Sequence, residues 1–219
     1  MKIFTLSNAF QTISFLDYGA TIHSWHAFSD QRNIILTHQN LSAYKNPENG
    51  FFGATIGRVA NRIKHGTFTL DHQVYTLDGH GGISSFAHQT FDVVFHSKLK
   101  ITFQYISKHL ESGYPGQVSC IVTYELKDQS LIVTYHATTN QETPLNMTNH
   151  TYFNLSKEST ILNHHLMISS QSYLETDSEQ IPTGRVLQTR DTPLSFETGK
   201  KLSNLFKDDF FKDTHQGLD

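Results

Sequence analysis

The chain has 219 residues, of which 37% are hydrophobic, and its formal net charge is −3. A chain of this length can form one sizeable core, because folding buries roughly 70% of the surface that the unfolded chain exposes. We therefore expect a single domain spanning residues 1–219. The sequence has no basic run, which argues against a nucleic-acid partner and favours a neutral or polar small molecule as ligand.

Cysteine usage and the N-terminus give an expectation for the compartment. Cys120 is the single cysteine, so the chain can form no internal disulfide, which favours a reducing environment. The first residues lack the basic and apolar regions of an export signal, and no apolar run approaches membrane-spanning length. We expect a cytoplasmic protein with no membrane partner.

Alternating strand patterns dominate the chain. Residues 1–6 form the first predicted strand, and residues 68–77 form a predicted hairpin that turns near Asp71 and His72. Three later segments alternate β-branched and aromatic residues with polar ones, as half-buried strands do: 101–106, 118–126 and 131–137. The short polar connector 127–130 predicts that the last two form an antiparallel hairpin.

Helical patterns are short. The candidates are residues 41–45 and residues 202–211, the second with Ser203 as a possible N-cap. Many strands, few short helices and no internal repeat predict a mostly-β protein built as a large antiparallel β-sandwich. The pattern alone does not distinguish a sandwich from a closed barrel.

Residues 143–155 form the densest polar cluster. If residues 146–155 are extended, the two-residue period separates a polar face from an apolar face. The polar face would hold Asn146, Thr148, His150, Tyr152 and Asn154, and the apolar face Met147, Phe153 and Leu155. Hydrogen-bonding groups beside an aromatic ring suit a carbohydrate. A solvent-exposed strand surface is the alternative.

His80 lies in a glycine-containing loop, residues 78–83, where the backbone can approach a ligand closely. An imidazole titrates at about pH 6.5, so it can donate or accept a proton near neutrality. The chain has 14 histidines, however, and most of them must be structural or surface groups. His80 is thus a candidate catalytic residue with a structural alternative.

Residues 51–63 hold two arginines, Arg58 and Arg62, among apolar and small residues. A guanidinium in such a setting is expected to be paired or to reach a ligand. Asn61 and Arg62 together would supply several donors to sugar hydroxyls. A structural salt bridge is the alternative.

Other chemistries lack their sequence requirements. The chain has no G-x-G-x-x-G, P-loop or G-x-S-x-G motif. The histidines at 164–165, and those at 80, 88 and 96, have metal-binding potential, but H-E-x-x-H and cysteine pairs are absent. We predict no metal site.

Taken in order along the chain, several segments resemble the aldose 1-epimerase family. These segments are residues 18–22, 53–63, 80–82, 113–116, 143–155, 173–177 and 181–184. The resemblance runs nearly end to end. It implies a large antiparallel β-sandwich, similar to galactose mutarotase, with an open sugar-binding cleft. It also implies interconversion of the α and β anomers of aldoses such as galactose and glucose, without a cofactor.

The resemblance also implies roles for single residues. His150 matches the family's general acid, which protonates the ring oxygen of the sugar. His80 matches a second histidine that contacts the same region of the substrate. Asn61, Arg62 and Asp219 match substrate-binding positions.

The family's general base is a glutamate in a C-terminal segment, and this sequence shows no counterpart. Glu175 and Glu197 match other parts of the family pattern, so we expect the domain to be C-terminally incomplete. Two alternatives stay open, a non-catalytic carbohydrate-binding domain and an epimerase of phosphorylated hexoses. A monomer or a homodimer is expected.

Overall fold

The computed structural model describes residues 1–27, 29–78 and 85–205. The chain divides into two compact units, residues 1–153 and residues 154–219. Within the described ranges, none of the helices is long and apolar enough to cross a membrane.

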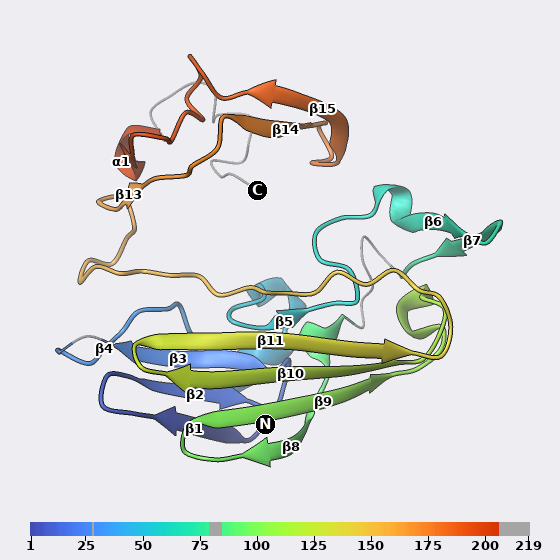
Figure 1. Cartoon of the computed structure of the whole chain (residues 1–219), viewed down its shortest axis with the longest axis horizontal. Helices are drawn as coiled ribbons and strands as arrows, with labels where there is room; N and C mark the ends of the chain where they lie inside the picture. The colour runs from blue at the N-terminus through green and yellow to red at the C-terminus, as the bar shows by residue number, and fades with distance from the viewer. Residues whose placement is uncertain (28, 79–84, 206–219) are drawn as a thin grey trace. The chain divides into compact units, whose positions relative to one another are not determined.

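Two four-stranded antiparallel sheets make up the first unit, with strand orders β1-β2-β3-β4 and β11-β10-β9-β8. Figure 1 shows the second sheet, in green to yellow, lying over the first, in blue. The strands of the first sheet are β1 (Ile3–Ser7), β2 (Thr12–Leu16), β3 (Thr21–Ala27) and β4 (Arg32–Asn33). Those of the second are β8 (Asp92–His96), β9 (Lys100–Ser107), β10 (Val118–Lys127) and β11 (Ser130–Thr139). The predicted mostly-β antiparallel sandwich is confirmed.

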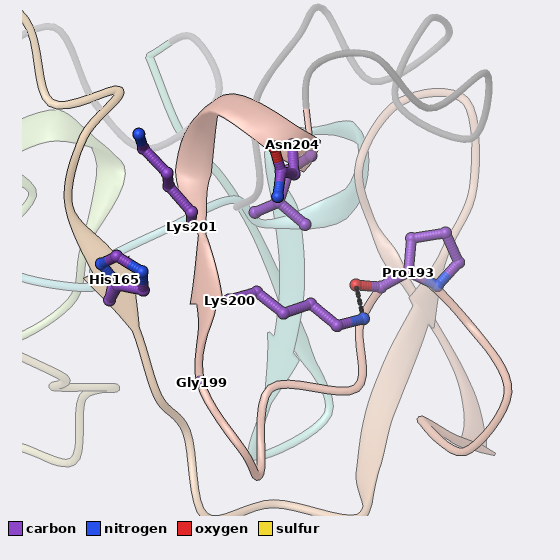
Figure 2. Close-up of a pocket in the computed structure, with 7 residues that line it drawn as sticks. His165, Pro193, Gly199, Lys200, Lys201 and Asn204 are labelled. Carbon is purple, nitrogen blue, oxygen red and sulfur yellow. Dashed lines mark hydrogen bonds between the residues drawn. The ribbon is translucent and has the colours of Figure 1, made fainter.

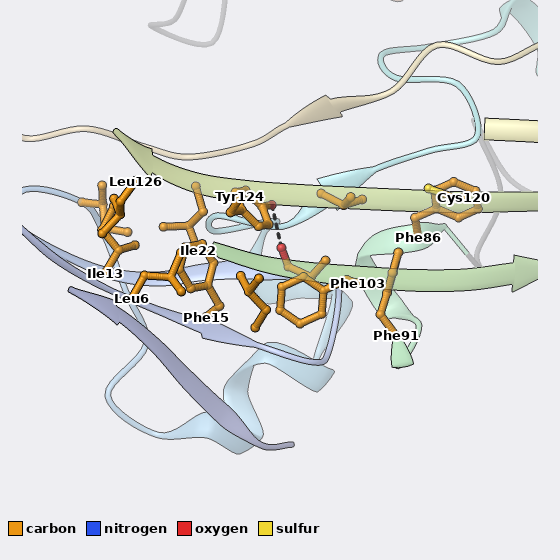
Figure 3. Close-up of a cluster of buried hydrophobic side chains, with 14 of the residues drawn as sticks. Leu6, Ile13, Phe15, Ile22, Phe86, Phe91, Phe103, Cys120, Tyr124 and Leu126 are labelled. Atoms are coloured by element: carbon orange, nitrogen blue, oxygen red, sulfur yellow. Dashed lines mark hydrogen bonds between the residues drawn. The ribbon is translucent and has the colours of Figure 1, made fainter. Parts of the chain in front are cut away.

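The core lies between these two sheets (Figure 3). Phe15 of the first sheet packs against Phe103 and Tyr124 of the second, with ring centroids 6.5 and 4.7 Å apart. In β10, every second side chain from Val118 to Leu126 is buried. Strict alternation of this kind places one face of a strand against a core and the other toward solvent, as the sequence predicts.

Shorter elements connect the sheets and pair outside them. The predicted hairpin is confirmed as β6 (Thr67–Leu70) and β7 (Gln73–Thr76), and both Asp71 and His72 have positive φ at its turn. The predicted helix at 41–45 is the 3-10 helix η1 (Leu41–Lys45). The remaining short elements of this unit are η2 (Pro47–Asn49), β5 (Thr55–Ile56), η3 (Lys64–Gly66), η4 (Phe86–His88), η5 (Glu111–Gly113) and β12 (Thr148–Asn149).

In the second unit, the described residues 154–205 form two small sheets and one helical turn. β13 (His165–Leu166) pairs with β16 (Lys200–Lys201), and β14 (Ser172–Thr176) pairs with β15 (Pro182–Gln188). Helix α1 (Leu202–Leu205) follows, and Phe196 and Leu205 form a small core with Leu202 packed against it. The helix starts at Leu202, as predicted, so Ser203 lies inside it and the suggestion of Ser203 as N-cap is wrong. Residues 206–211 of the predicted helix lie outside the described residues.

Arg58 is a buried structural group, with 2% of its surface exposed. Among the described residues, its guanidinium donates to neutral oxygens. They include the Ser107 hydroxyl (2.9 Å) and the carbonyls of Pro115 (2.7 Å), Lys108 (2.8 Å) and Gly116 (2.9 Å). Burial lowers the pKa of Arg58, and the nearby Glu111 carboxylate opposes this effect. Arg58 thereby anchors the segment that carries Asn61 and Arg62 to the end of the second sheet.

We expect Arg58→Leu to lower the free energy of unfolding by about 3 kcal/mol, because the carbonyls of Pro115, Lys108 and Gly116 lose a charged donor. Urea unfolding followed by circular dichroism measures this change. Arg190→Leu is the matched control, since the Arg190 side chain is 90% exposed and should shift stability by no more than about 0.5 kcal/mol. Equal effects of the two substitutions would contradict the structural role of Arg58.

Tyr124 joins three parts of the first unit through one buried hydroxyl. The residue is fully buried, and its hydroxyl donates to the carbonyl oxygen of Ala20 at 2.7 Å. The Asn149 amide donates to the same hydroxyl at 3.4 Å, and Thr55 Oγ1 lies 3.5 Å away. Tyr124 thus links β10 to the start of β3 and to both strands of the β5–β12 pair.

Tyr124→Phe removes this hydroxyl and leaves the Ala20 carbonyl without its donor. We expect the free energy of unfolding to fall by about 2 kcal/mol, the cost of an unsatisfied buried polar group. Tyr75→Phe is the control, because the Tyr75 hydroxyl donates to the Gln73 side chain within one hairpin. A Tyr124→Phe protein as stable as the wild type in thermal and urea unfolding would refute the linking role.

Candidate functional site

Two segments that the sequence singles out lie side by side. Residues 53–60 and 146–150 are joined through the β5–β12 pair, Thr55 with Asn149 and Ile56 with Thr148. Further backbone bonds extend the pairing on both sides: Gly53 N–H to His150 O (3.0 Å), His150 N–H to Ala54 O (2.9 Å), Asn146 N–H to Arg58 O (2.8 Å) and Ala60 N–H to Asn146 O (2.7 Å). The backbone N–H and the backbone carbonyl of His150 are therefore both hydrogen-bonded to the 53–60 segment.

Gly53 allows its segment to pack closely against β3. It has a φ of +70°, and a Cβ at this position would collide with the carbonyl oxygen of Ile22. Only glycine tolerates both the backbone conformation and the approach. The Gly53 carbonyl also accepts a hydrogen bond from the Asn149 amide at 2.9 Å. This glycine brings the His150 segment against β3.

The predicted alternation of faces is observed from Met147 to Tyr152. Met147 packs against the core beside Cys120, and Asn149 turns inward to Gly53 and Tyr124. Thr148 and Tyr152 are exposed, and His150 is half-buried. Residues 146–155 do not form one continuous strand, because Thr148–Asn149 pair with β5 while Asn146 and Phe153 form isolated bridges. The predicted apolar face is wrong at Phe153 and Leu155, which are exposed.

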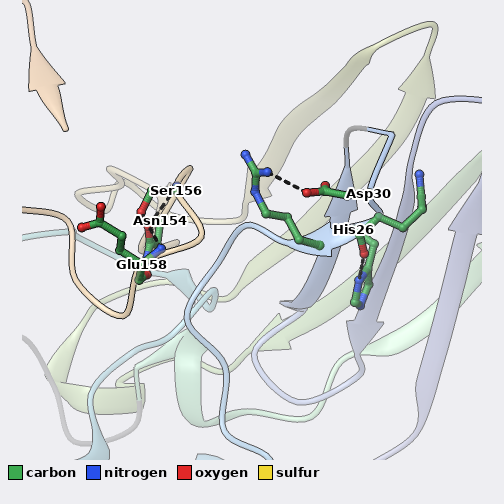
Figure 4. Close-up of polar contacts among 7 residues, drawn as sticks. His26, Asp30, Asn154, Ser156 and Glu158 are labelled. Carbon is green, nitrogen blue, oxygen red and sulfur yellow. Dashed lines mark hydrogen bonds and ion pairs between the residues drawn. The ribbon is translucent and has the colours of Figure 1, made fainter. Parts of the chain in front are cut away.

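Asn154 does not continue the polar face. Its side-chain amide donates to the carbonyl oxygen of Glu158 at 2.8 Å, and its oxygen accepts from the backbone N–H of Ser156 at 3.1 Å (Figure 4). These bonds make Asn154 the start of a local turn in the second unit. Figure 4 also shows His26, whose Nδ1 lies 2.8 Å from Gln31 O in a turn of the first unit.

Aromatic rings surround the His150 imidazole. Its ring centroid lies 4.9 Å from that of Tyr152 and 5.8 Å from that of Phe51. Phe52 contacts Tyr152 at 5.1 Å and stacks on His38 at 4.6 Å with an interplanar angle of 7°. Tyr152 was predicted from the sequence to share a face with His150, but Phe51, Phe52 and His38 were not, although Phe51 and Phe52 directly precede the Gly53 motif. A polar imidazole on an aromatic surface is an arrangement that suits the C–H faces and hydroxyls of a sugar.

Asn61 and Arg62 follow this paired segment. Both residues are exposed, Asn61 has a φ of +64°, and Arg62 Nη1 donates to Asn61 Oδ1 at 3.2 Å. The structure therefore places them on the continuation of the segment that pairs with the His150 segment. His80 and Asp219, the other two predicted site residues, lie outside the described residues.

Glu175 is occupied by a local ion pair in the second unit. Its carboxylate lies 3.1 Å from Arg185 Nη1 and accepts a hydrogen bond from the Thr183 hydroxyl at 2.8 Å. Both partners belong to the β14–β15 hairpin. The Glu175 carboxylate is thus engaged within its own hairpin.

A separate hollow of about 450 Å³ lies in the second unit (Figure 2). Its lining includes His165, Lys200, Lys201 and Asn204. Lys200 Nζ donates to the carbonyl oxygen of Pro193 at 3.1 Å, as the dashed line in Figure 2 shows. Across the described ranges, no cluster of three or more His, Cys, Asp or Glu side chains could hold a metal ion.

Comparison with known proteins gives one consistent family. Human galactose mutarotase is 35% identical to this chain, covering 94% of the chain and 65% of the human protein. The aldose 1-epimerase of Escherichia coli K12 is 33% identical, covering 94% of the chain and 63% of that protein. The chain thus spans less than two thirds of the length of these relatives.

Solved structures agree with the sequence relatives. A crystal structure of an aldose epimerase homologue from C. elegans superposes with a TM-score of 0.87 at 29% identity, covering 93% of this chain and 66% of that one. Galactose 1-epimerase from Lactobacillus acidophilus gives a TM-score of 0.83 at 25% identity, covering 94% and 64%. The family model for aldose 1-epimerase matches residues 2–219. With this match over nearly all of its length, the chain belongs to the aldose 1-epimerase family.

Proposed function

We propose that this chain is an aldose 1-epimerase, which interconverts the α and β anomers of aldohexoses such as galactose and glucose without a cofactor. The observation that carries the proposal is the setting of His150. Its half-buried imidazole sits among Phe51 and Tyr152, and its backbone is fixed by bonds to Gly53 and Ala54. A positioned imidazole can transfer a proton near neutral pH.

In the proposed mechanism, His150 donates a proton to the ring oxygen of the sugar while a base removes the proton of the C1 hydroxyl. The bond between C1 and the ring oxygen breaks, and its electron pair stays on that oxygen. A rotation about the C1–C2 bond then allows the hydroxyl formed from the ring oxygen to attack either face of the aldehyde. The acid and the base exchange roles in this step. Each positioned proton-transfer group typically contributes about 10²- to 10⁴-fold in rate.

The remaining assignments belong to the same proposal. His80 would assist His150 at the ring, and Asn61, Arg62 and Asp219 would bind sugar hydroxyls. The general base is left unassigned, because no glutamate of this sequence matches it. We also propose that both units belong to one domain, that the protein acts in the cytoplasm as a monomer or homodimer, and that its partner is a sugar.

Phosphorylated hexoses are a second candidate substrate class. The observation that favours them is the hollow of the second unit, where Lys200, Lys201 and His165 gather. Cationic side chains bind phosphate oxygens well. Inhibition of galactose mutarotation by low concentrations of glucose 6-phosphate, and not by glucose, would favour this class.

His150→Gln should reduce the enzymatic rate of mutarotation by at least about 100-fold, because glutamine cannot supply the proton. Polarimetry of freshly dissolved α-D-galactose measures the rate against the buffer reaction. His26→Gln is the control, since the His26 imidazole serves a surface turn, and it should keep the wild-type rate.

Three results of this experiment have distinct meanings. Loss of activity in His150→Gln alone supports the assigned role. Substantial turnover by the folded His150→Gln protein would contradict it. A wild-type chain that binds galactose in a calorimetric titration but leaves the rate at the buffer value would instead indicate a non-catalytic carbohydrate-binding domain.

A further inference from the structure

Phe51 lies between two imidazoles. Its ring centroid is 5.8 Å from that of His150, at an interplanar angle of 47°, and 5.6 Å from that of His88, at 43°. The Phe51 side chain remains 36% exposed despite these contacts. A single exposed phenylalanine needs no functional explanation, but an exposed ring flanked by two hydrogen-bonding rings has the make-up of a sugar platform.

His88 has one buried ring nitrogen and one that is available to a ligand in the favoured tautomer. Its Nδ1 atom is buried, with no hydrogen-bond partner within the part of the chain that the structure describes. Burial lowers the pKa of His88, so the neutral imidazole dominates near pH 7. Since a proton on Nδ1 would have no acceptor, the tautomer with its proton on Nε2 is favoured, and Nε2–H becomes the available donor.

The backbone around His88 is fixed to the same framework as His150. Gly19 N–H donates to Gln89 O at 2.7 Å, and Thr55 N–H donates to Gly19 O at 2.8 Å. A Cβ at Gly19, whose φ is +68°, would lie 2.8 Å from the carbonyl oxygen of Ala87. These close contacts connect η4, which carries His88, to β5, which pairs with the His150 strand. The two imidazoles and Phe51 are therefore preorganised relative to one another.

We propose that Phe51 and His88 form a binding wall of the sugar site, in which the Phe51 ring packs against the C–H face of a hexopyranose and His88 Nε2–H donates to one of its hydroxyls. This inference rests on the proposed function, because it places the sugar beside His150. It assigns specificity and positioning to two residues outside the sequence motifs of the site. Neither residue is given a proton-transfer role.

Methyl β-D-galactopyranoside tests the wall separately from catalysis, because its blocked C1 oxygen prevents ring opening. Its dissociation constant is measured by NMR titration. We expect Phe51→Leu, which keeps apolar volume but removes the ring face, to weaken binding about tenfold. Phe10→Leu is the matched control, since Phe10 is 47% exposed at the β1–β2 turn, and its affinity should stay within about twofold of wild type.

Two substitutions with side chains of similar size to histidine test the role of His88. His88→Phe keeps a ring but has no donor, and we expect about fivefold weaker binding. His88→Gln retains an N–H donor and should recover most of the affinity. A purely structural role of His88 would predict the reverse order, because the aromatic replacement preserves the packing with Phe51 and Tyr18. Thermal unfolding of each variant confirms that folded protein is compared.

The outcomes separate the wall from the proposed function. Wild-type affinity in folded Phe51→Leu and His88→Phe proteins would overturn the wall while leaving the role of His150 intact. Weakened glycoside binding in these variants, in a chain that fails to speed mutarotation, would support the wall and reject the catalytic proposal. A wild-type chain that does not bind the glycoside would overturn the wall, and polarimetry with α-D-galactose would then decide the catalytic proposal on its own.

Discussion

The buried hydroxyl of Tyr124 is the interaction on which the site depends. It lies between the two sheets, donates to the carbonyl oxygen of Ala20 and accepts from the Asn149 amide one residue before His150. Burial raises the pKa of Tyr124 to about 12, so the group stays a donor throughout the physiological range. A polar contact of this kind inside an apolar core has strict geometry, because an unmade bond there is costly. The core thereby fixes the register of the strand that presents His150.

The candidate site is built on the backbone pairing of two segments next to this contact. Residues 53–60 carry Gly53 at one end and lead to Asn61 and Arg62 at the other, and residues 146–150 run beside them. Arg58 fixes the same segment to the second sheet through carbonyls at its end. The side chains of the candidate site are thus carried by paired main chain, an arrangement that suits the proton transfer proposed for His150.

The sequence predicted those features that arise locally. β10 was recognisable because burial of one face imposes a two-residue period, and the β6–β7 turn because Asp71 and His72 tolerate positive φ. The start of α1 at Leu202 was predicted, but Ser203 lies inside the helix and is not its N-cap. Phe51 and His88 were not identified as neighbours because their segments are joined through Gly19, which is distant from both along the chain. His150 was found through its motif, but its aromatic surroundings follow only from the fold.

The central claim is that His150, Phe51 and His88 form one preorganised sugar site. Long-range ¹H–¹⁵N spectra of the histidine imidazoles, recorded during titration with galactose, test it most directly. The account predicts that the ring resonances of His150 and His88 shift together with a single dissociation constant, whereas those of His26 and His96 stay in place. Unchanged His150 and His88 resonances at saturating galactose, in a folded protein, would contradict it.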